Sequence, residues 1–582
     1  EKAARRRRVA PSLLFSPDEA KWHDTEAIAA LALRGVKGAS ELDPDLASFA
    51  VLFEGPPPDR DLLSASENAR LSGEIKQFLM MLSPHLLSQC AQECLEGLLQ
   101  RYEVHQHNVD DVLACALPYH DSPLFTRLIQ GLHIEGKSRW AWLQSIKEKP
   151  ATLVRATLAK YFSKDISVLI FLGEIVQETA RLQKSNRALS TFFTAVWLDL
   201  LASVNVPSTD LVLAAMPPIL AALRQPHLRD VFQAAVSVAG ALCLKVELEL
   251  SVLRKLCERV AKAVSEDMAS TSIAFLAMVL QLQGSQGLSM KAVRHLADAG
   301  VEVVARSLPE ALECSNFVAV LTQLCLTQAA SAAASSGEGS SESQLQELVQ
   351  GLLTFPAIVD RYADPLCLSV LEAFKTVCVD GTAEEEELKS AAAVLQQPLA
   401  ALNARQPLAL SAALTKALDS GILRGEVAER LLTTLLTPAG VGRSEDADSI
   451  SIVDVIRAFS DPSTKKRSKA AQKAIQELEA AGTAGDEARR RLLVSLLLQS
   501  AQDQDLEVAT KTLKMEVLWS SLPHAPAATT APFLLRLLES LLPASRTIGK
   551  SLEAGFAAIL LERARVCALL PLAIQCFTLV YR

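Results

Sequence analysis

The 582-residue chain has few aromatic residues and few glycines: Phe, Trp and Tyr together make up 5% of it, and Gly occurs 24 times. No stretch shows the sustained two-residue alternation and hairpin turns that are typical of β-structure. Hydrophobic residues nevertheless account for 50% of the chain, mainly as Ala, Leu and Val. Ala and Leu are strong helix formers because they lose little conformational freedom in a helix. The composition therefore predicts an all-α protein.

Three further absences narrow the class of protein. The longest apolar run, Val566–Val580, is interrupted by Pro571 and Gln575 and is shorter than the ~18–20 residues of a membrane span. The eleven cysteines lack the spacing of a disulfide framework, and no secretory leader opens the sequence, which favours a reducing compartment. With a net charge of −8, contact with RNA or DNA would need local basic patches. We expect a soluble intracellular protein without membrane association.

Catalytic motifs are also missing, apart from one string that resembles a nucleotide-binding loop. Residues 131–138 read GLHIEGKS, a literal match to the phosphate-binding G-x4-G-K-[ST] motif. Such a loop follows a buried strand and opens a helix whose N–H groups hold the phosphates. Here the preceding Ser122–Gln130 begins with a capping serine and a proline and continues with helical spacing. We therefore predict a coincidental match, no cofactor and no enzymatic activity.

A possible zinc site is only slightly better supported than the nucleotide-binding loop. Cys90 and Cys94 share a helix face but fall within an apolar stripe, whereas His105 and His107 are two residues apart instead of the usual three to five. Buried cysteines are common in protein cores. We interpret all four as core and surface residues and predict no metal site.

Helical periodicity organises the rest of the chain. Between Pro84 and Tyr102, an apolar stripe recurs every three or four positions with polar residues such as Glu96 between its members, as on an amphipathic helix. The stripe consists of Leu87, Ala91, Cys94, Leu98 and Tyr102. Breaks follow roughly every 18–22 residues, so two helices give a period near 40, which is typical of HEAT or armadillo repeats. Because one such repeat cannot bury its apolar face alone, neighbours must stack. The predicted fold is an all-α, HEAT/armadillo-like helical-repeat solenoid.

The expected organisation has four parts: a basic flexible tail at 1–15, a first block of HEAT-like repeats at 16–329, a disordered linker or loop at 330–344, and a second repeat block at 345–582. The third part is rich in Ser, Ala and Gly and cannot form a core. Thr437–Ser449 and Ala480–Asp486 are expected to be shorter loops of the same kind.

Two basic features are candidates for contact with RNA or a protein partner. The first is the run Arg5, Arg6, Arg7 and Arg8, which fits phosphate binding, a nuclear import signal or an unstructured solubilising tail equally well. The second is a cationic helix face of Lys465, Lys466 and Arg467 with Lys469 and Lys473; it follows Asp461-Pro462-Ser463, which is expected to cap the helix. A solvated helix face is the plainer interpretation of the second feature, because Glu477 and Glu479 follow closely.

Several stretches of the first 260 residues resemble a known family. They are Arg7-Arg8-Val9 leading to the SLLFSP of 12–17, the LPYH of 117–120 followed by Phe125, Arg127 and Gln130, and the WAWL of 140–143 followed by Pro150. Together they resemble the U3 small nucleolar RNA-associated protein 10 family. Members of that family are much longer, so the resemblance implies that this chain is an N-terminal segment.

The resemblance implies a large, non-catalytic HEAT-repeat scaffold of the nucleus and nucleolus. It further implies membership of the UtpA subcomplex of the small-subunit processome, with β-propeller proteins as partners. That assembly binds the 5′ external transcribed spacer of pre-rRNA and supports pre-rRNA transcription and 18S rRNA maturation. Whether this segment touches the RNA directly stays open, and so does an alternative role as a nuclear-transport or cytosolic adaptor that binds protein cargo.

Overall fold

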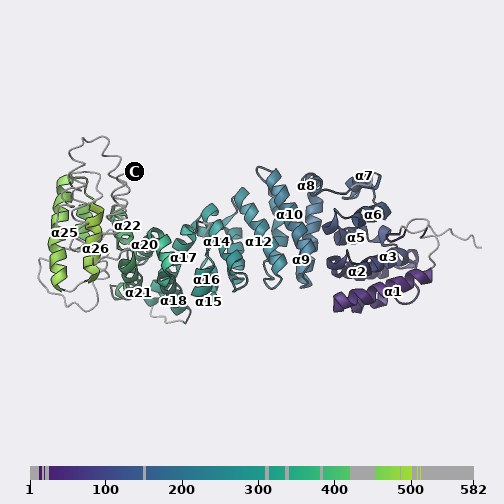
Figure 1. The fold of residues 1–582 in the computed structure, drawn as a ribbon, viewed down its shortest axis with the longest axis horizontal. Coiled ribbons are helices and arrows are strands. Elements are labelled where there is room, and N and C mark those ends of the chain that lie inside the picture. Colours follow the sequence, from purple (N-terminus) through teal and green to yellow (C-terminus); the bar gives the residue numbers. More distant parts are fainter. Residues whose placement is uncertain are drawn as a thin grey trace, which may run out of the picture. The chain divides into compact units, whose positions relative to one another are not determined.

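The computed structural model describes residues 12–15, 19, 25–148, 152–308, 313–334, 340–379, 385–419, 452–484 and 487–500, with the single residues 508 and 512. All regular secondary structure in these residues is helical, so the predicted all-α, helical-repeat fold class is confirmed (Figure 1). The chain divides into two compact units, Glu1–Ala263 and Val264–Arg582.

Unit 1 begins with helices that are interrupted by short 3-10 turns and continues with longer, regular helices. Its elements are α1 (Thr25–Leu42), η1 (Pro44–Phe53), η2 (Arg60–Leu62), α2 (Ala65–Leu82), η3 (Ser83–His85), α3 (Gln89–Tyr102), α4 (Val104–His107), α5 (Val109–Ala116), η4 (Leu117–Tyr119), α6 (Pro123–Gly131), η5 (Ala141–Leu143), α7 (Gln144–Glu148), α8 (Arg155–Lys164), α9 (Ile166–Arg181), α10 (Arg187–Ser203), α11 (Thr209–Ala222), α12 (Arg229–Lys245) and α13 (Leu250–Lys262).

Alternate helices of unit 1 pack along one another, as in a helical-repeat array. Helix α10 lies between α8 and α12 in one layer, and α9 packs along α11 in the other. Large side chains such as Phe162, Phe193 and Trp197 fill the interior and are almost completely buried. This arrangement follows from the amphipathic stripes, since each helix must cover its apolar face with a neighbour.

Polar caps set where several of these helices begin. The Ser122 hydroxyl accepts a hydrogen bond from the Phe125 N–H at the start of α6, and the Ser208 hydroxyl accepts one from Leu211 at the start of α11. The sequence predicts both breaks from a Ser and Pro pair. A side-chain acceptor satisfies one of the orphan N–H groups in the first turn, which fixes the first residue of the helix.

Helices α1 and α3 cross at very short range because glycines line their contact. A β-carbon placed on Gly35 would lie 2.8 Å from the Cys90 carbonyl oxygen, and one on Gly97 would lie 2.4 Å from the Ala32 Cβ. Any larger residue would therefore force the two helices apart. Helices α1 and α3 are therefore in extensive contact along this crossing.

Unit 2 continues the layered pattern. Its elements are α14 (Ala269–Gln283), η6 (Ser285–Gly287), α15 (Met290–Ala299), α16 (Val301–Arg306), α17 (Ser315–Ala334), α18 (Ser340–Thr354), α19 (Pro356–Arg361), α20 (Ala363–Phe374), the π-helical turn η7 (Lys375–Val379), α21 (Glu385–Arg405), α22 (Pro407–Asp419), α24 (Ile452–Phe459), α25 (Thr464–Ala484) and α26 (Glu487–Ser500). Helices α14, α17, α20 and α22 pack in succession, and α16, α18 and α21 form a second row. None of the described helices combines the length and apolarity that a membrane crossing requires.

The structure corrects several predicted boundaries. The division between compact units falls after Ala263 rather than at 330. The predicted loop at 330–344 is too broad, because α17 runs to Ala334 and α18 starts at Ser340. Helix α25 likewise continues to Ala484, through most of the predicted Ala480–Asp486 loop. Small Ala and Ser residues suit a helix end as well as a loop, so composition alone did not separate the two. Thr437–Ser449 lies outside the described residues.

Candidate interaction surfaces

The end of the predicted basic tail is held in place by a buried carboxylate. Glu96 of α3 is fully buried, and its Oε2 accepts hydrogen bonds from the backbone N–H groups of Leu13 at 2.7 Å and Leu14 at 3.2 Å. The Leu13 side chain is itself buried. The flexible tail predicted for 1–15 was therefore too long, because residues 12–15 dock on α3. The arginines at positions 5–8 lie outside the described residues.

The second predicted basic feature forms the first turn of α25. Asp461 precedes this turn: its Oδ2 accepts a hydrogen bond from Lys466 Nζ at 2.8 Å, and its Oδ1 accepts the Ser463 N–H at 2.9 Å. These bonds hold the pKa of Asp461 below its usual value. Arg467 donates to the carbonyl of Asp461, 3.0 Å away. The Asp461-Pro462-Ser463 segment thus leads into α25 as predicted, and two of the three cations turn back toward Asp461.

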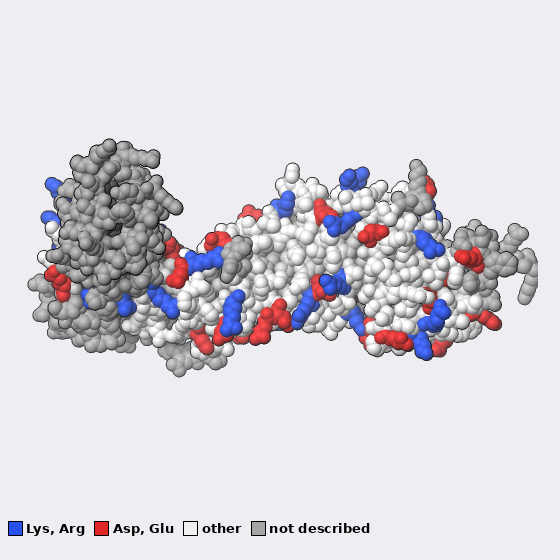
Figure 2. All heavy atoms as spheres, in the orientation of Figure 1, with Lys and Arg blue, Asp and Glu red and all other residues white. Residues whose placement is uncertain are grey.

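Lys465 differs from Lys466 and Arg467 because it has no ion pair among the described residues. Lys469 and Lys473 follow it at four-residue intervals on the same face of α25 and are also exposed. Further along α25, Glu477 pairs with Arg489 at 2.7 Å. On the face drawn in Figure 2, described cationic and anionic residues are interspersed, and neither sign forms a large patch. The basic surface offered by α25 is therefore a narrow stripe from Lys465 to Lys473.

The residues that carry the family resemblance mostly support the fold. Tyr119 Oη donates to the Ser83 carbonyl at 2.7 Å, and Nδ1 of the buried His120 lies 2.7 Å from the Leu153 carbonyl. The His120 ring also packs against Phe192, with 5.5 Å between centroids. These contacts fix the turn between α5 and α6 against later helices.

The WAWL segment at 140–143 also supports the fold. Trp140 is buried, donates from Nε1 to Asp110 and packs edge-on against Phe171. Trp142 stacks on Tyr161 at 4.7 Å between centroids. Arg127 and Gln130 on α6 belong to the same recognisable segment, yet both are exposed. They are the members of that segment whose side chains face solvent rather than the core.

The nucleotide-loop match has the wrong surroundings. Helix α6 ends at Gly131, where a phosphate loop would require the end of a strand. Residues 132–140 then pass through a bend, turns and irregular backbone to a single 3-10 turn, η5. Lys147 from α7 donates to the Leu132 carbonyl at 2.7 Å. The helix predicted before the motif is present, and this context does not fit a phosphate-binding loop.

The four residues considered for zinc are spread over two packing environments. Cys94 is buried on α3, where desolvation raises the pKa of its thiol to about 12. Burial also lowers the pKa of His105 on α4 to about 4, with His107 and His133 adding to the effect. Among the described residues, no group of three or more His, Cys, Asp or Glu side chains is arranged to hold a metal ion.

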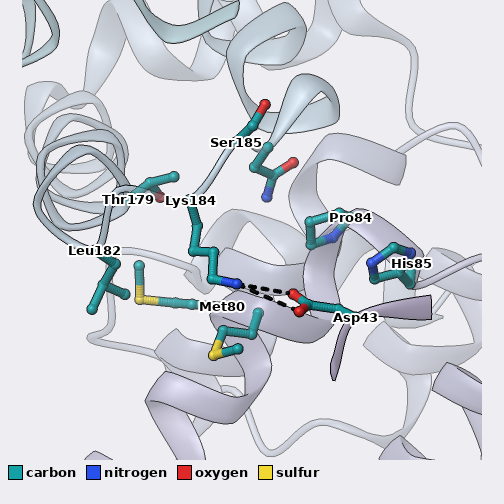
Figure 3. Close-up of a pocket in the computed structure, with 10 residues that line it drawn as sticks. Asp43, Met80, Pro84, His85, Thr179, Leu182, Lys184 and Ser185 are labelled. Carbon is teal, nitrogen blue, oxygen red and sulfur yellow. Dashed lines mark hydrogen bonds and ion pairs between the residues drawn. The ribbon is translucent and has the colours of Figure 1, made fainter. Parts of the chain in front are cut away.

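A small cavity of about 130 Å³ lies where the η1 corner, the end of α2 and the α9–α10 turn meet (Figure 3). Lys184 reaches across it and pairs with both carboxylate oxygens of Asp43 at 3.4 Å, and also with Asp45. The hydrogen bond to Asp45 is the main reason that the pKa of Lys184 is raised. Sequence reasoning missed this contact because its partners are about 140 positions apart.

A second hollow, between α9 and α11, was also missed. It has a volume of about 580 Å³ and is lined by Ile166, Ile170, Glu174, Gln177, Asp210, Leu213, Ala214, Pro217 and Pro218. The signal available in the sequence was the Pro217-Pro218 pair inside a helical stretch, since consecutive prolines remove helical hydrogen bonds.

Comparisons with known proteins place these features in context. The chain is 31% identical to an uncharacterized Arabidopsis thaliana protein over 326 residues, which are 53% of this chain and 15% of that protein. It is 28% identical to human HEAT repeat-containing protein 1 over 300 residues, 49% of this chain and 14% of the human one. U3 small nucleolar RNA-associated protein 10 of Schizosaccharomyces pombe is 29% identical over 206 residues, 35% of this chain and 12% of the relative.

No family model matches the chain. A solved circular tandem repeat protein is similar at 12% identity, covering 89% of this chain and 97% of its own, with a TM-score of 0.19, which is too low to carry an argument. The matched segment spans about 12–20% of the length of the curated relatives. Over about half of its length, the chain is therefore homologous to proteins named HEAT repeat-containing protein 1 and U3 small nucleolar RNA-associated protein 10, which confirms the resemblance seen in its sequence.

Proposed function

We propose that this chain is a non-catalytic scaffold segment in ribosome biogenesis, part of the UtpA subcomplex of the small-subunit processome. It would bind partner proteins of β-propeller type and act in the nucleolus during pre-rRNA transcription and 18S rRNA maturation. The observation that carries the proposal is the homology to relatives named for U3 small nucleolar RNA association. The layered helices support it, because stacked repeats spread binding energy over many small contacts.

The face drawn in Figure 2 suits protein partners better than a large RNA footprint. Charges of both signs are interspersed on it, and binding to RNA depends on several cations that neutralise neighbouring phosphates. We assign contact with the 5′ external transcribed spacer to the arginine run at 5–8, with Lys465, Lys466 and Arg467 as a weaker second site. Lys466 and Arg467 already donate hydrogen bonds to Asp461.

Affinity purification of the tagged chain from nuclear extract tests the scaffold role, with recovered proteins and RNA both identified. Recovery of processome proteins together with 5′ spacer RNA is the expected result. Recovery of the proteins alone would remove the RNA contact from this segment. Recovery of neither, from a chain that circular dichroism shows to be folded, would overturn the proposal, and recovery of transport cargo instead would favour an adaptor.

The RNA contact has its own test. Replacing the four arginines at 5–8 by Ala should flatten the dependence of RNA affinity on salt by up to about 0.7 in logarithmic slope for each phosphate that is no longer neutralised. Replacing Lys465 alone should have a smaller effect. Binding curves for a fluorescent spacer RNA at several salt concentrations measure both slopes, and an unchanged slope would exclude the residue concerned.

A further inference from the structure

The groove between α9 and α11 combines features that suit one kind of ligand. Its apolar residues are unusually exposed: Ile170 on α9 has 47% of its surface accessible, and Leu213 on α11 has 63%. Together with Ile166 and Pro217 they leave an apolar floor in contact with water. A partner that covered this floor would gain stability from burying it.

The rim of the same groove is negatively charged. Glu174 and Asp210 are the two charged residues of its lining, and both are exposed carboxylates. Neither forms an ion pair with a cation in the part of the chain that the structure describes. A cationic ligand would complement this rim, whereas the phosphates of RNA would be repelled by it.

The backbone of α11 adds hydrogen-bond acceptors at the same place. Pro217 and Pro218 have no N–H, so the carbonyls of Leu213 and Ala214, four residues earlier, lack their usual helical donors. Gly173 keeps α9 close to this point, since a β-carbon there would lie 3.1 Å from Pro218 Cγ. Donors on a ligand can satisfy carbonyls that the helix leaves free.

We propose that the α9–α11 groove binds a short segment of a partner protein that carries Lys or Arg beside an aliphatic or aromatic side chain. The apolar side chain would lie between Ile170 and Leu213. The cation would pair with Glu174 or Asp210, beside the α11 carbonyls that lack a donor four residues later. This inference rests on the proposed scaffold function for its biological meaning, but its chemistry can be tested separately.

The test measures fluorescence anisotropy of three labelled synthetic peptides of equal length, which alternate Arg with Leu, Glu with Leu, and Arg with Ser. The whole chain should bind the Arg–Leu peptide and bind the other two at least about tenfold more weakly, because both the charge and the apolar contact are needed. Equal binding of the Arg–Ser peptide would overturn the proposal, since it would show attraction to net charge alone.

Matched variants locate the binding. Leu213→Asn and the double variant Glu174→Gln/Asp210→Asn should each weaken binding of the Arg–Leu peptide by about fivefold to tenfold. The controls are Leu62→Asn, at a residue that is 83% exposed, and Glu26→Gln/Glu41→Gln on the exposed face of α1. Both controls should leave affinity unchanged. If controls and groove variants lose affinity equally, the groove is not the site.

Two further outcomes separate this inference from the scaffold function. If a single-stranded RNA oligonucleotide displaces the peptide and binds the Leu213→Asn variant more weakly than the unaltered chain, the occupant is nucleic acid and the proposal is wrong. If the groove variants lose the peptide yet recover every processome protein from nuclear extract, the natural partner does not use the groove and the scaffold function stands. Failure of the unaltered chain to recover processome proteins overturns the function instead.

Discussion

The carboxylate of Glu96, buried on α3, accepts hydrogen bonds from the backbone amides of Leu13 and Leu14, more than eighty positions earlier in the chain. Hydrogen bonds to a charged acceptor are stronger than neutral ones, and a buried acceptor has no water to replace a missing donor. One side chain thus holds the segment 12–15 against the helices of unit 1.

Glu96→Ala should release this segment and destabilise unit 1 by roughly 2–3 kcal/mol, because two charge-assisted hydrogen bonds disappear. Hydrogen exchange should accelerate at the Leu13 and Leu14 amides. Glu96→Gln, which keeps one carbonyl acceptor, should show a smaller increase. Amides of Leu13 and Leu14 that stay as protected as before would contradict the anchoring role.

Gly35 and Gly73 offer a matched pair of helical glycines. Gly35→Ala should destabilise the protein by about 1–3 kcal/mol, because the new methyl group would meet the backbone of α3. Gly73→Ala on the exposed side of α2 meets nothing within 4 Å and should stabilise by up to about 1 kcal/mol. Urea unfolding measures both. The two substitutions shifting the midpoint in the same direction would contradict the close α1–α3 crossing.

His105 should make stability fall in mild acid. Its pKa is about 4 in the folded protein against an ordinary value of 6.5, because burial disfavours the charged ring. The unfolded chain therefore binds the proton first, so stability decreases as the pH drops from about 6.5 to about 4 and not above that range. His105→Gln, which cannot titrate, should flatten this part of the curve. Urea midpoints at a series of pH values provide the measurement, with His227→Gln at an exposed histidine as the control.

Six buried cysteines should resist alkylation in the folded protein. Burial raises the pKa of Cys94, Cys115, Cys243, Cys257, Cys325 and Cys367 to about 12. At pH 8 their fraction of thiolate, the reactive species, would be about a thousandfold lower than that of an ordinary thiol. Mass spectrometry after iodoacetamide treatment should find them unmodified until urea is added. Cys90, which is only half-buried, should react earlier.

The helices themselves could be predicted because their signals are local. The stripe that includes Ala91, Cys94 and Leu98 is buried as the spacing indicates, and the caps at Ser122 and Ser208 begin helices as expected. At the edges of the same stripe, the spacing predicted the wrong burial for two residues. Leu87 precedes α3 and is 57% exposed, whereas Glu96, assigned to the polar side, is fully buried. Periodicity identifies one covered face, but it cannot show that a helix is enclosed from two sides.

The candidate sites were less predictable for a related reason. The α9–α11 groove brings together residues about 40 positions apart, such as Ile170 and Leu213, and depends on a packing distance that composition does not encode. The basic cluster at 465–467 was visible in the sequence, but periodicity does not show that Lys466 and Arg467 donate to Asp461 while Lys465 has no ion pair among the described residues. Arg5, Arg6, Arg7 and Arg8 stay a prediction.

The bridge from Lys184 to Asp43 also bears on the order in which unit 1 assembles. Short-range helix pairs can form early, whereas this bridge closes a loop of about 140 residues and must await the helices between its partners. Interactions that form after the rate-limiting step of folding affect the unfolding rate far more than the folding rate. The bridge would therefore form late in folding. Without it, unit 1 would fold at nearly the same rate but unfold faster.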